Sequence, residues 1–130
     1  MAKAGGNGSS RPARKPLVWL QGEVKSPPFT REGRLEAGLL LRLLQEGEQL
    51  GMPHARRLAD VGPRCGELRI RDASHNWRII YRVDDDAILV VEVFEKKTQK
   101  LPKAVINRCQ KRLIAYDEAV RAAGENPEPS

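Results

Sequence analysis

Basic side chains gather where an apolar run ends in the second half of the chain. The run ILVVEVF (88–94) is followed at once by Glu95, Lys96 and Lys97, and Lys100 comes soon after. Such closely spaced lysines need either water or an anion around them, because an unpaired ammonium group is costly to bury. Positioned cations also stabilise the charge that develops on a reacting phosphate. The cluster therefore predicts an anion site at the end of a strand.

Arginines alternate with apolar residues in the two segments before that run. GELRIRD (66–72) and NWRIIYRV (76–83) both have the two-residue period of a strand. Arginine is enriched where phosphate is bound through two parallel hydrogen bonds. The alternative is a solvated sheet face, balanced by Glu67, Glu92 and Glu95, and composition does not separate the two. Each strand sends its arginines to one side, namely Arg69, Arg71, Arg78 and Arg82.

Two histidines and an acidic run are further candidates for chemistry. His75 falls in the turn between the arginine strands, and His54 lies beside Arg56 and Arg57. They allow an acid–base pair, although a polar surface role is favoured for each. The acidic run 84–86 is interpreted as a charged turn, because three consecutive acids at an extended tip do not converge on one metal ion. No metal or cofactor motif is recognised, so neither is predicted.

The overall composition favours one small basic domain. The chain has 130 residues, with 23 Lys and Arg against 17 Asp and Glu, a net charge of +6 and a pI of about 9.7. A basic field of this kind favours a polyanionic partner. Cys65 and Cys109 have no metal-binding spacing and are expected as reduced thiols. No apolar stretch is long enough for a membrane helix and no signal peptide is evident, so a cytoplasmic protein is expected.

The elements expected along the chain give an α+β fold. Residues 1–16 are interpreted as a flexible basic tail, 17–120 as one domain, and 121–130 as a frayed C-terminal tail. A strand is expected over 17–24, followed by a helix that Thr30 caps and a short helical turn over 53–59. Three antiparallel strands follow over 66–72, 76–83 and 88–95, and then a helix over 102–120.

Apolar stripes on the two helices predict how they cover the sheet. The first helix carries Leu35, Leu39, Leu43 and Leu44 at helical spacing. The last carries Ile106, Cys109 and Leu113, with Tyr116 or Ala115. We expect an N-terminal helix, or helix pair, and the C-terminal helix to cover one face of a small antiparallel sheet. That face carries Leu68, Ile70, Trp77, Ile79 and Tyr81, which leaves the arginine face open.

These segments resemble the RelE superfamily of bacterial toxins, and most closely its HigB-like, phage-related group. The resemblance rests on GELRIRD, NWRIIYRV and ILVVEVFEKKTQKLPK, and it spans residues 17–116. It implies the toxin of a type II toxin–antitoxin system with a RelE/ParE-like fold. It also implies a metal-independent mRNA endonuclease that inhibits translation, either ribosome-dependent, which is favoured, or acting on free mRNA, with a helix-turn-helix antitoxin as partner and no cofactor.

The resemblance also assigns roles to residues. Arg69 and Arg78 would bind the scissile and flanking phosphates. Lys96 and Lys97 would stabilise charge or donate a proton, which a lysine does near neutral pH only when its pKa is lowered. Further contacts to RNA are expected from Arg71, Arg82, Lys100, Arg56, Arg57 and His75.

Two other functions remain open. The same fold carries ParE-type toxins, which inhibit a topoisomerase by binding, and a shared fold does not establish a shared function. A phage-derived relative that binds RNA without cleaving it is the other alternative. Cleavage products and effects on growth distinguish the three.

Overall fold

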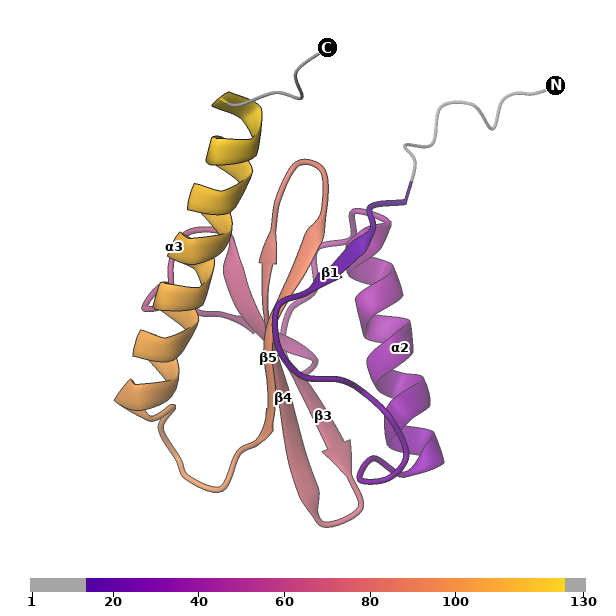
Figure 1. Cartoon of the computed structure of the whole chain (residues 1–130). Coiled ribbons are helices and arrows are strands. Elements are labelled where there is room, and N and C mark those ends of the chain that lie inside the picture. The colour runs from indigo at the N-terminus through magenta and orange to yellow at the C-terminus, as the bar shows by residue number, and fades with distance from the viewer. Residues whose placement is uncertain (1–13, 126–130) are drawn as a thin grey trace, which may run out of the picture.

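A five-stranded sheet runs through the middle of the molecule, with one helix on each side of it (Figure 1). The computed structural model describes residues 14–125, so most of the expected N-terminal tail and the last five residues lie outside the described part. The α+β fold class is confirmed. Its elements are β1 (Leu17–Trp19), α2 (Arg31–Gln45), β2 (Ala55–Arg57), β3 (Cys65–Asp72), β4 (His75–Val83), β5 (Ile88–Glu95) and α3 (Lys103–Glu125).

The sheet has the strand order β1-β5-β4-β3-β2. The three predicted strands form an antiparallel meander, with bounds that differ from the expected ones by at most one residue. β1 instead pairs with β5 in parallel, Leu17 opposite Ile88, so the sheet is mixed. The short helical turn expected over 53–59 is wrong, because Ala55–Arg57 forms β2 against β3.

The two helices cover opposite faces of the sheet, and the expectation that they share one face is wrong. Leu40 and Leu44 of α2 pack in one core cluster with Ile79 of β4. Cys109 and Leu113 of α3 pack in a second cluster that contains Ile80, Leu89 and Val91. The signal was present in the sequence, because an unbroken apolar run such as Ile88 to Val91 is typical of a strand buried on both faces.

The buried stripe of α2 also differs from the predicted one. Leu44 is buried and Leu43 is half-buried against the same core, as expected, but the other buried residues are Gly33, Ala37, Leu40 and Leu41. Leu35 and Leu39 are 51% and 57% exposed. The leucine-rich sequence 39–44 is compatible with two stripes, and contact with the sheet selects the one that contains the small Ala37.

Thr30 caps α2 as predicted, and a buried aspartate holds the cap in place. The Thr30 side chain accepts a hydrogen bond from the backbone N–H of Gly33. Asp72, at the end of β3, accepts hydrogen bonds from the Thr30 N–H at 2.9 Å and from Trp77 Nε1 at 3.3 Å. Gly33 is required here, because a Cβ at this position would collide with the Asp72 carboxylate. The start of the helix is thereby tied to the β3–β4 turn.

Candidate functional site

The strand register brings the predicted arginines together on the face that α3 partly covers. Arg69 of β3 lies directly opposite Arg78 of β4, and Arg78 lies opposite Phe94 of β5. One row further along, Arg56 of β2 lies opposite Glu67. Cross-strand partners project to the same face. Arg69 and Arg78 therefore lie side by side across the two strands, and the next cross-strand pair on the same face contains Glu67.

A polar hollow of about 480 Å³ opens at this end of the face. Helix α3 packs over Ile80, Leu89 and Val91, further along the strands. Figure 1 shows the chain leaving the end of β5 and swinging away from the sheet before α3 begins. This leaves the arginine row accessible. The hollow, called the basic hollow below, is lined by Arg69, Ser74, Asn76, Arg78, Glu95, Lys96, Lys97, Thr98 and Gln99.

Arg78 forms the inner wall of the basic hollow and is only 8% exposed. Its Nη1 donates a hydrogen bond to the Trp77 carbonyl at 3.0 Å. Its Nε lies 3.3 Å from Oε1 of Glu67, yet neither of these two atoms has a hydrogen bond of good geometry within the described residues. Burial, and then the neighbouring charge of Arg69, lower the pKa of Arg78 against the opposing effect of Glu67.

Glu67 is the residue of this region that the sequence pattern did not single out for the site. It is 1% exposed, the most deeply buried charged side chain of the described residues. The sequence pattern predicts it only as one of several acids that balance a solvated face. Its burial comes from the packing of β2 and β4 on either side of β3, which a two-residue alternation does not reveal.

Lys96 lies at the edge of the hollow with a lowered pKa. Its backbone N–H pairs with the carbonyl of Asn76, which fixes the start of the loop after β5. Burial and the surrounding positive charges lower the pKa of Lys96, while the carboxylate of Glu67 raises it. The contributing cations are Arg78, Arg56 and Arg69. Lys97, the next residue, is exposed and also lines the hollow.

His75 and Glu95 form a pair at the edge of this region. His75 Nδ1 lies 2.6 Å from Glu95 Oε2, and the imidazole stacks on Trp77 with ring centroids 5.7 Å apart. Trp77 belongs to the core on the α2 side, so the ring of His75 is directed to that side. Glu95, which lines the hollow, is thus paired with a histidine that is not part of the lining.

The structure does not bring Arg82 to the basic hollow. Arg82 donates hydrogen bonds of 2.7–2.9 Å to both oxygens of Asp84 and to both oxygens of Asp117 on α3. The bonds to Asp117 and then to Asp84 raise the pKa of Arg82. Its place in this network indicates a structural role in joining α3 to the sheet.

The remaining predicted contacts lie around the hollow without lining it. Arg71 is exposed opposite Asn76, and Lys100 is exposed in the loop before α3. Arg56 and Arg57 are both exposed on β2, but they project to opposite faces, and only Arg56 shares the side of Glu67. Tyr81 packs in the core as predicted. His54 is exposed beside β2 and does not meet His75.

The described residues contain neither a cluster of metal ligands nor a membrane-spanning helix. Among the described residues, no three His, Cys, Asp or Glu side chains cluster in a way that would hold a metal ion. No helix in the described part of the chain combines the length and apolar character needed to cross a membrane. Both cysteines are free and buried.

Comparison with known protein families gives a match over residues 29–114 to the phage-derived proteins described as Gp49-like (DUF891). The match includes α2, all the strands from β2 to β5, and the first half of α3. The chain belongs to the Gp49-like family. Gp49-like proteins are associated with toxins of the RelE and HigB type, which confirms the expected toxin family at this level. Neither the curated proteins nor the solved structures gave a significant match to this Gp49-like chain.

Proposed function

We propose that this Gp49-like protein is a HigB-like toxin that cleaves mRNA on the ribosome without a metal ion. The observation that carries the proposal is the convergence of Arg69, Arg78, Lys96 and Lys97 on one open hollow. These residues come from two strands and the loop that follows β5, and the family resemblance assigns all four to RNA. A hollow with four cations and one carboxylate attracts phosphate and repels a divalent cation.

The reaction is an attack of the ribose 2′-oxygen on the adjacent phosphorus. The P–O2′ bond forms while the P–O5′ bond breaks, which gives a 2′,3′-cyclic phosphate and a 5′-hydroxyl end. The 2′-hydroxyl loses a proton and the departing 5′-oxygen gains one. Negative charge grows on the phosphorane in between, and fixed cations stabilise that charge.

The geometry supports a division of these tasks. Arg69 and Arg78 lie side by side in the strand register and hold the phosphate. Lys96 is suited to proton transfer, since burial and then the nearby arginines lower its pKa. Lys97 is exposed at the mouth of the hollow and adds charge for the flanking RNA. Glu67 is too deeply buried to contact RNA, and it acts by positioning Arg78.

The partners follow from the same assignment. The substrate is mRNA, presented on the ribosome in the cytoplasm, and the activity inhibits translation. A cognate helix-turn-helix antitoxin neutralises the toxin. No cofactor takes part in the proposed reaction.

The direct test is cleavage of a defined mRNA by the purified chain, with and without translating ribosomes, followed by mapping of the new 5′ ends. Free RNA is also tested with EDTA present. The site variant is Lys96→Ala with Lys97→Ala, which avoids the buried Arg78. The matched control is Lys111→Ala, which removes an exposed lysine of α3. Circular dichroism checks that all three proteins are folded.

We expect 5′-hydroxyl ends with the native chain and the Lys111 variant, and none with the double variant. Equal cleavage by all three proteins would place the active site elsewhere. Absence of cleavage under every condition would contradict the nuclease. If the native chain then inhibits a topoisomerase, the ParE-type alternative takes its place.

A further inference from the structure

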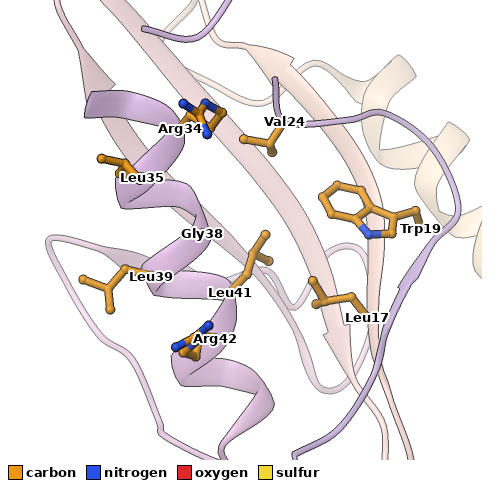
Figure 2. Close-up of a pocket in the computed structure, with 9 residues that line it drawn as sticks. All are labelled: Leu17, Trp19, Val24, Arg34, Leu35, Gly38, Leu39, Leu41 and Arg42. Atoms are coloured by element: carbon orange, nitrogen blue, oxygen red, sulfur yellow. The ribbon is translucent and has the colours of Figure 1, made fainter. Parts of the chain in front are cut away.

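An apolar groove lies on the α2 side of the molecule, away from the basic hollow. Figure 2 shows Leu17 and Trp19 of β1 on one side and helix α2 on the other, with Leu41 pointing between them. The groove has a volume of about 570 Å³. Trp19 is 42% exposed, so large apolar side chains border the groove on both sides. It is lined by Leu17, Trp19, Val24, Arg34, Leu35, Gly38, Leu39, Leu41 and Arg42.

Helix α2 exposes two leucines, Leu35 and Leu39, to solvent. Leu35 and Leu39 lie one turn apart on the outer side of α2 and contribute little to the core. Between them, Gly38 has open space where a side chain would extend, although glycine in a helix interior costs about 1 kcal/mol relative to alanine. An apolar surface rimmed by polar residues is typical of a protein-binding site. The glycine allows another backbone to approach closely.

Two arginines mark the ends of the groove. Arg34 and Arg42 are eight residues apart on α2, which separates them by about 12 Å, or two helical turns. The ion pairs of the described residues include neither of them. A partner that covers the leucines therefore gains from carboxylates spaced two turns apart.

We propose that this groove binds an amphipathic, acidic α-helix of another protein. A helix that lies along α2 presents apolar side chains at one-turn intervals to Leu35 and Leu39, which matches helix-in-groove recognition. Its acidic residues pair with Arg34 and Arg42 at the two ends. Trp19 lines the opposite wall, and tryptophan and arginine are enriched among the residues that dominate binding energy.

Other occupants fit these charges less well. Residues 1–13 carry lysine and arginine but no acid, and residues 126–130 contain no large apolar side chain. A second copy docked through the same groove about a two-fold axis would place Arg34 or Arg42 against an arginine of its partner. An anionic membrane surface matches the charge but not the two-walled shape of the groove.

Binding in this groove leaves the basic hollow free. Leu41 and Leu17 of the groove pack with the core on the α2 side. Arg78 projects to the other face, where α3 lies. The inference thus goes beyond the nuclease proposal and does not depend on it.

The test is a selection from a displayed library of random helical peptides on the full chain. The counter-selection uses a Leu35→Ser, Leu39→Ser variant, whose changes are at exposed positions and preserve the core. We expect enriched peptides with apolar residues at i, i+3 or i+4, and i+7, together with acids at both ends. Their affinity should fall about tenfold or more in the Leu variant and in an Arg34→Glu, Arg42→Glu variant. The matched control is Ile114→Ser with Val120→Ser, two exposed apolar residues of α3, which should bind as the native chain does.

Several results would overturn the inference. One is a selection that yields no peptide able to distinguish the native chain from the Leu variant. Another is enrichment of peptides without acidic residues. A concentration-dependent dimer that the Leu variant abolishes would assign the groove to a second copy, and binding to anionic vesicles lost in the same variant would assign it to a membrane. RNA cleavage should be unchanged in the Leu variant, so failure of the nuclease proposal is scored separately.

Discussion

Arg78 and Arg82 lie on the same strand and project to the same face, yet their surroundings differ. Arg82 makes four hydrogen bonds to two carboxylates. Arg78 makes one hydrogen bond, to a backbone carbonyl, and has a looser contact with Glu67. A guanidinium carries five N–H donors. Arg82 is therefore nearly saturated, while Arg78 retains donors for a ligand.

The comparison separates scaffold from site on one sheet face. Where α3 covers the sheet, Asp117 of the helix closes the network around Arg82. At the end of the sheet that α3 does not cover, the acid paired with Arg78 among the described residues is Glu67, which belongs to the sheet itself. The hydrogen bonds from Asp117 and Asp84 raise the pKa of Arg82, whereas burial lowers the pKa of Arg78. Two residues of the same type thus differ in their hydrogen bonds and in the direction of their pKa shifts because only one of them lies under α3.

The largest expected effect is on catalysis at the open end. Lys96→Ala should reduce the rate of RNA cleavage by about 10²–10³-fold, or roughly 2.7–4 kcal/mol in the barrier, because a charge-stabilising group is lost. Single-turnover cleavage of a defined mRNA measures this effect. Urea denaturation should show a nearly unchanged stability. A rate within twofold of the native rate would mean that the hollow is not the site of cleavage.

Arg82→Ala should show the reverse pattern. It leaves Asp84 and Asp117 without their shared cation and should lower the free energy of unfolding by about 2–4 kcal/mol, less than a fully buried pair because Asp117 is half exposed. Urea denaturation measures this loss. Cleavage per folded molecule should persist. Loss of cleavage in an Arg82 variant of unchanged stability would show that Arg82 contributes to the reaction and not to stability.

Asp72 is a buried acid whose carboxylate accepts hydrogen bonds, and its contribution to stability should depend on pH. Burial opposes its charged form, but hydrogen bonds from Thr30 and Trp77 outweigh burial and lower the pKa of Asp72. Its stabilising effect is therefore present above the unfolded pKa, near 4, and is lost as the pH falls through the folded pKa. Asp72→Asn should cost about 1–2 kcal/mol at neutral pH. The difference from the native chain should shrink in urea titrations as the pH falls below about 4, and a difference independent of pH would contradict this account.

Glu67→Gln tests the coupling between the buried carboxylate and Lys96. Glu67 raises the pKa of Lys96 against burial and the arginines, so its removal should lower that pKa further. If protonated Lys96 donates the proton, the alkaline limb of the cleavage profile should move to lower pH. The pH dependence of kcat/KM measures the shift, with Glu48→Gln, an exposed residue of a distant loop, as the control. An unmoved limb would remove Lys96 as the titrating group.

The smallest effect compares two neighbouring arginines on β2. Arg56 projects to the side of the basic hollow and Arg57 to the other side. Arg56→Ala should reduce the slope of log affinity for single-stranded RNA against log salt by about 0.7, the value for one phosphate contact. Arg57→Ala should leave the slope unchanged. Fluorescence anisotropy over a salt series measures both, and equal effects would show that RNA does not distinguish the two faces.

Much of this molecule is readable from local sequence. Alternation in GELRIRD and NWRIIYRV locates β3 and β4 and assigns Arg69 and Arg78 to one face, because side chains of a strand alternate regardless of what packs on them. Thr30 marks the start of α2, since its N-cap hydrogen bond is made with Gly33, only three residues further along the chain. The lysines after β5 are placed by the end of the strand itself.

Tertiary packing decided the rest. Which face each helix covers, the burial of Glu67 and the capture of Arg82 by Asp117 all depend on contacts between segments distant in sequence. The outward position of Leu35 and Leu39 was likewise set by the sheet, since the helix offered two leucine stripes of similar spacing. The sequence by itself determines the direction of each side chain along its own strand or helix, because backbone geometry sets that direction. Only the assembled fold decides which of those side chains meet a partner and which remain available for a ligand.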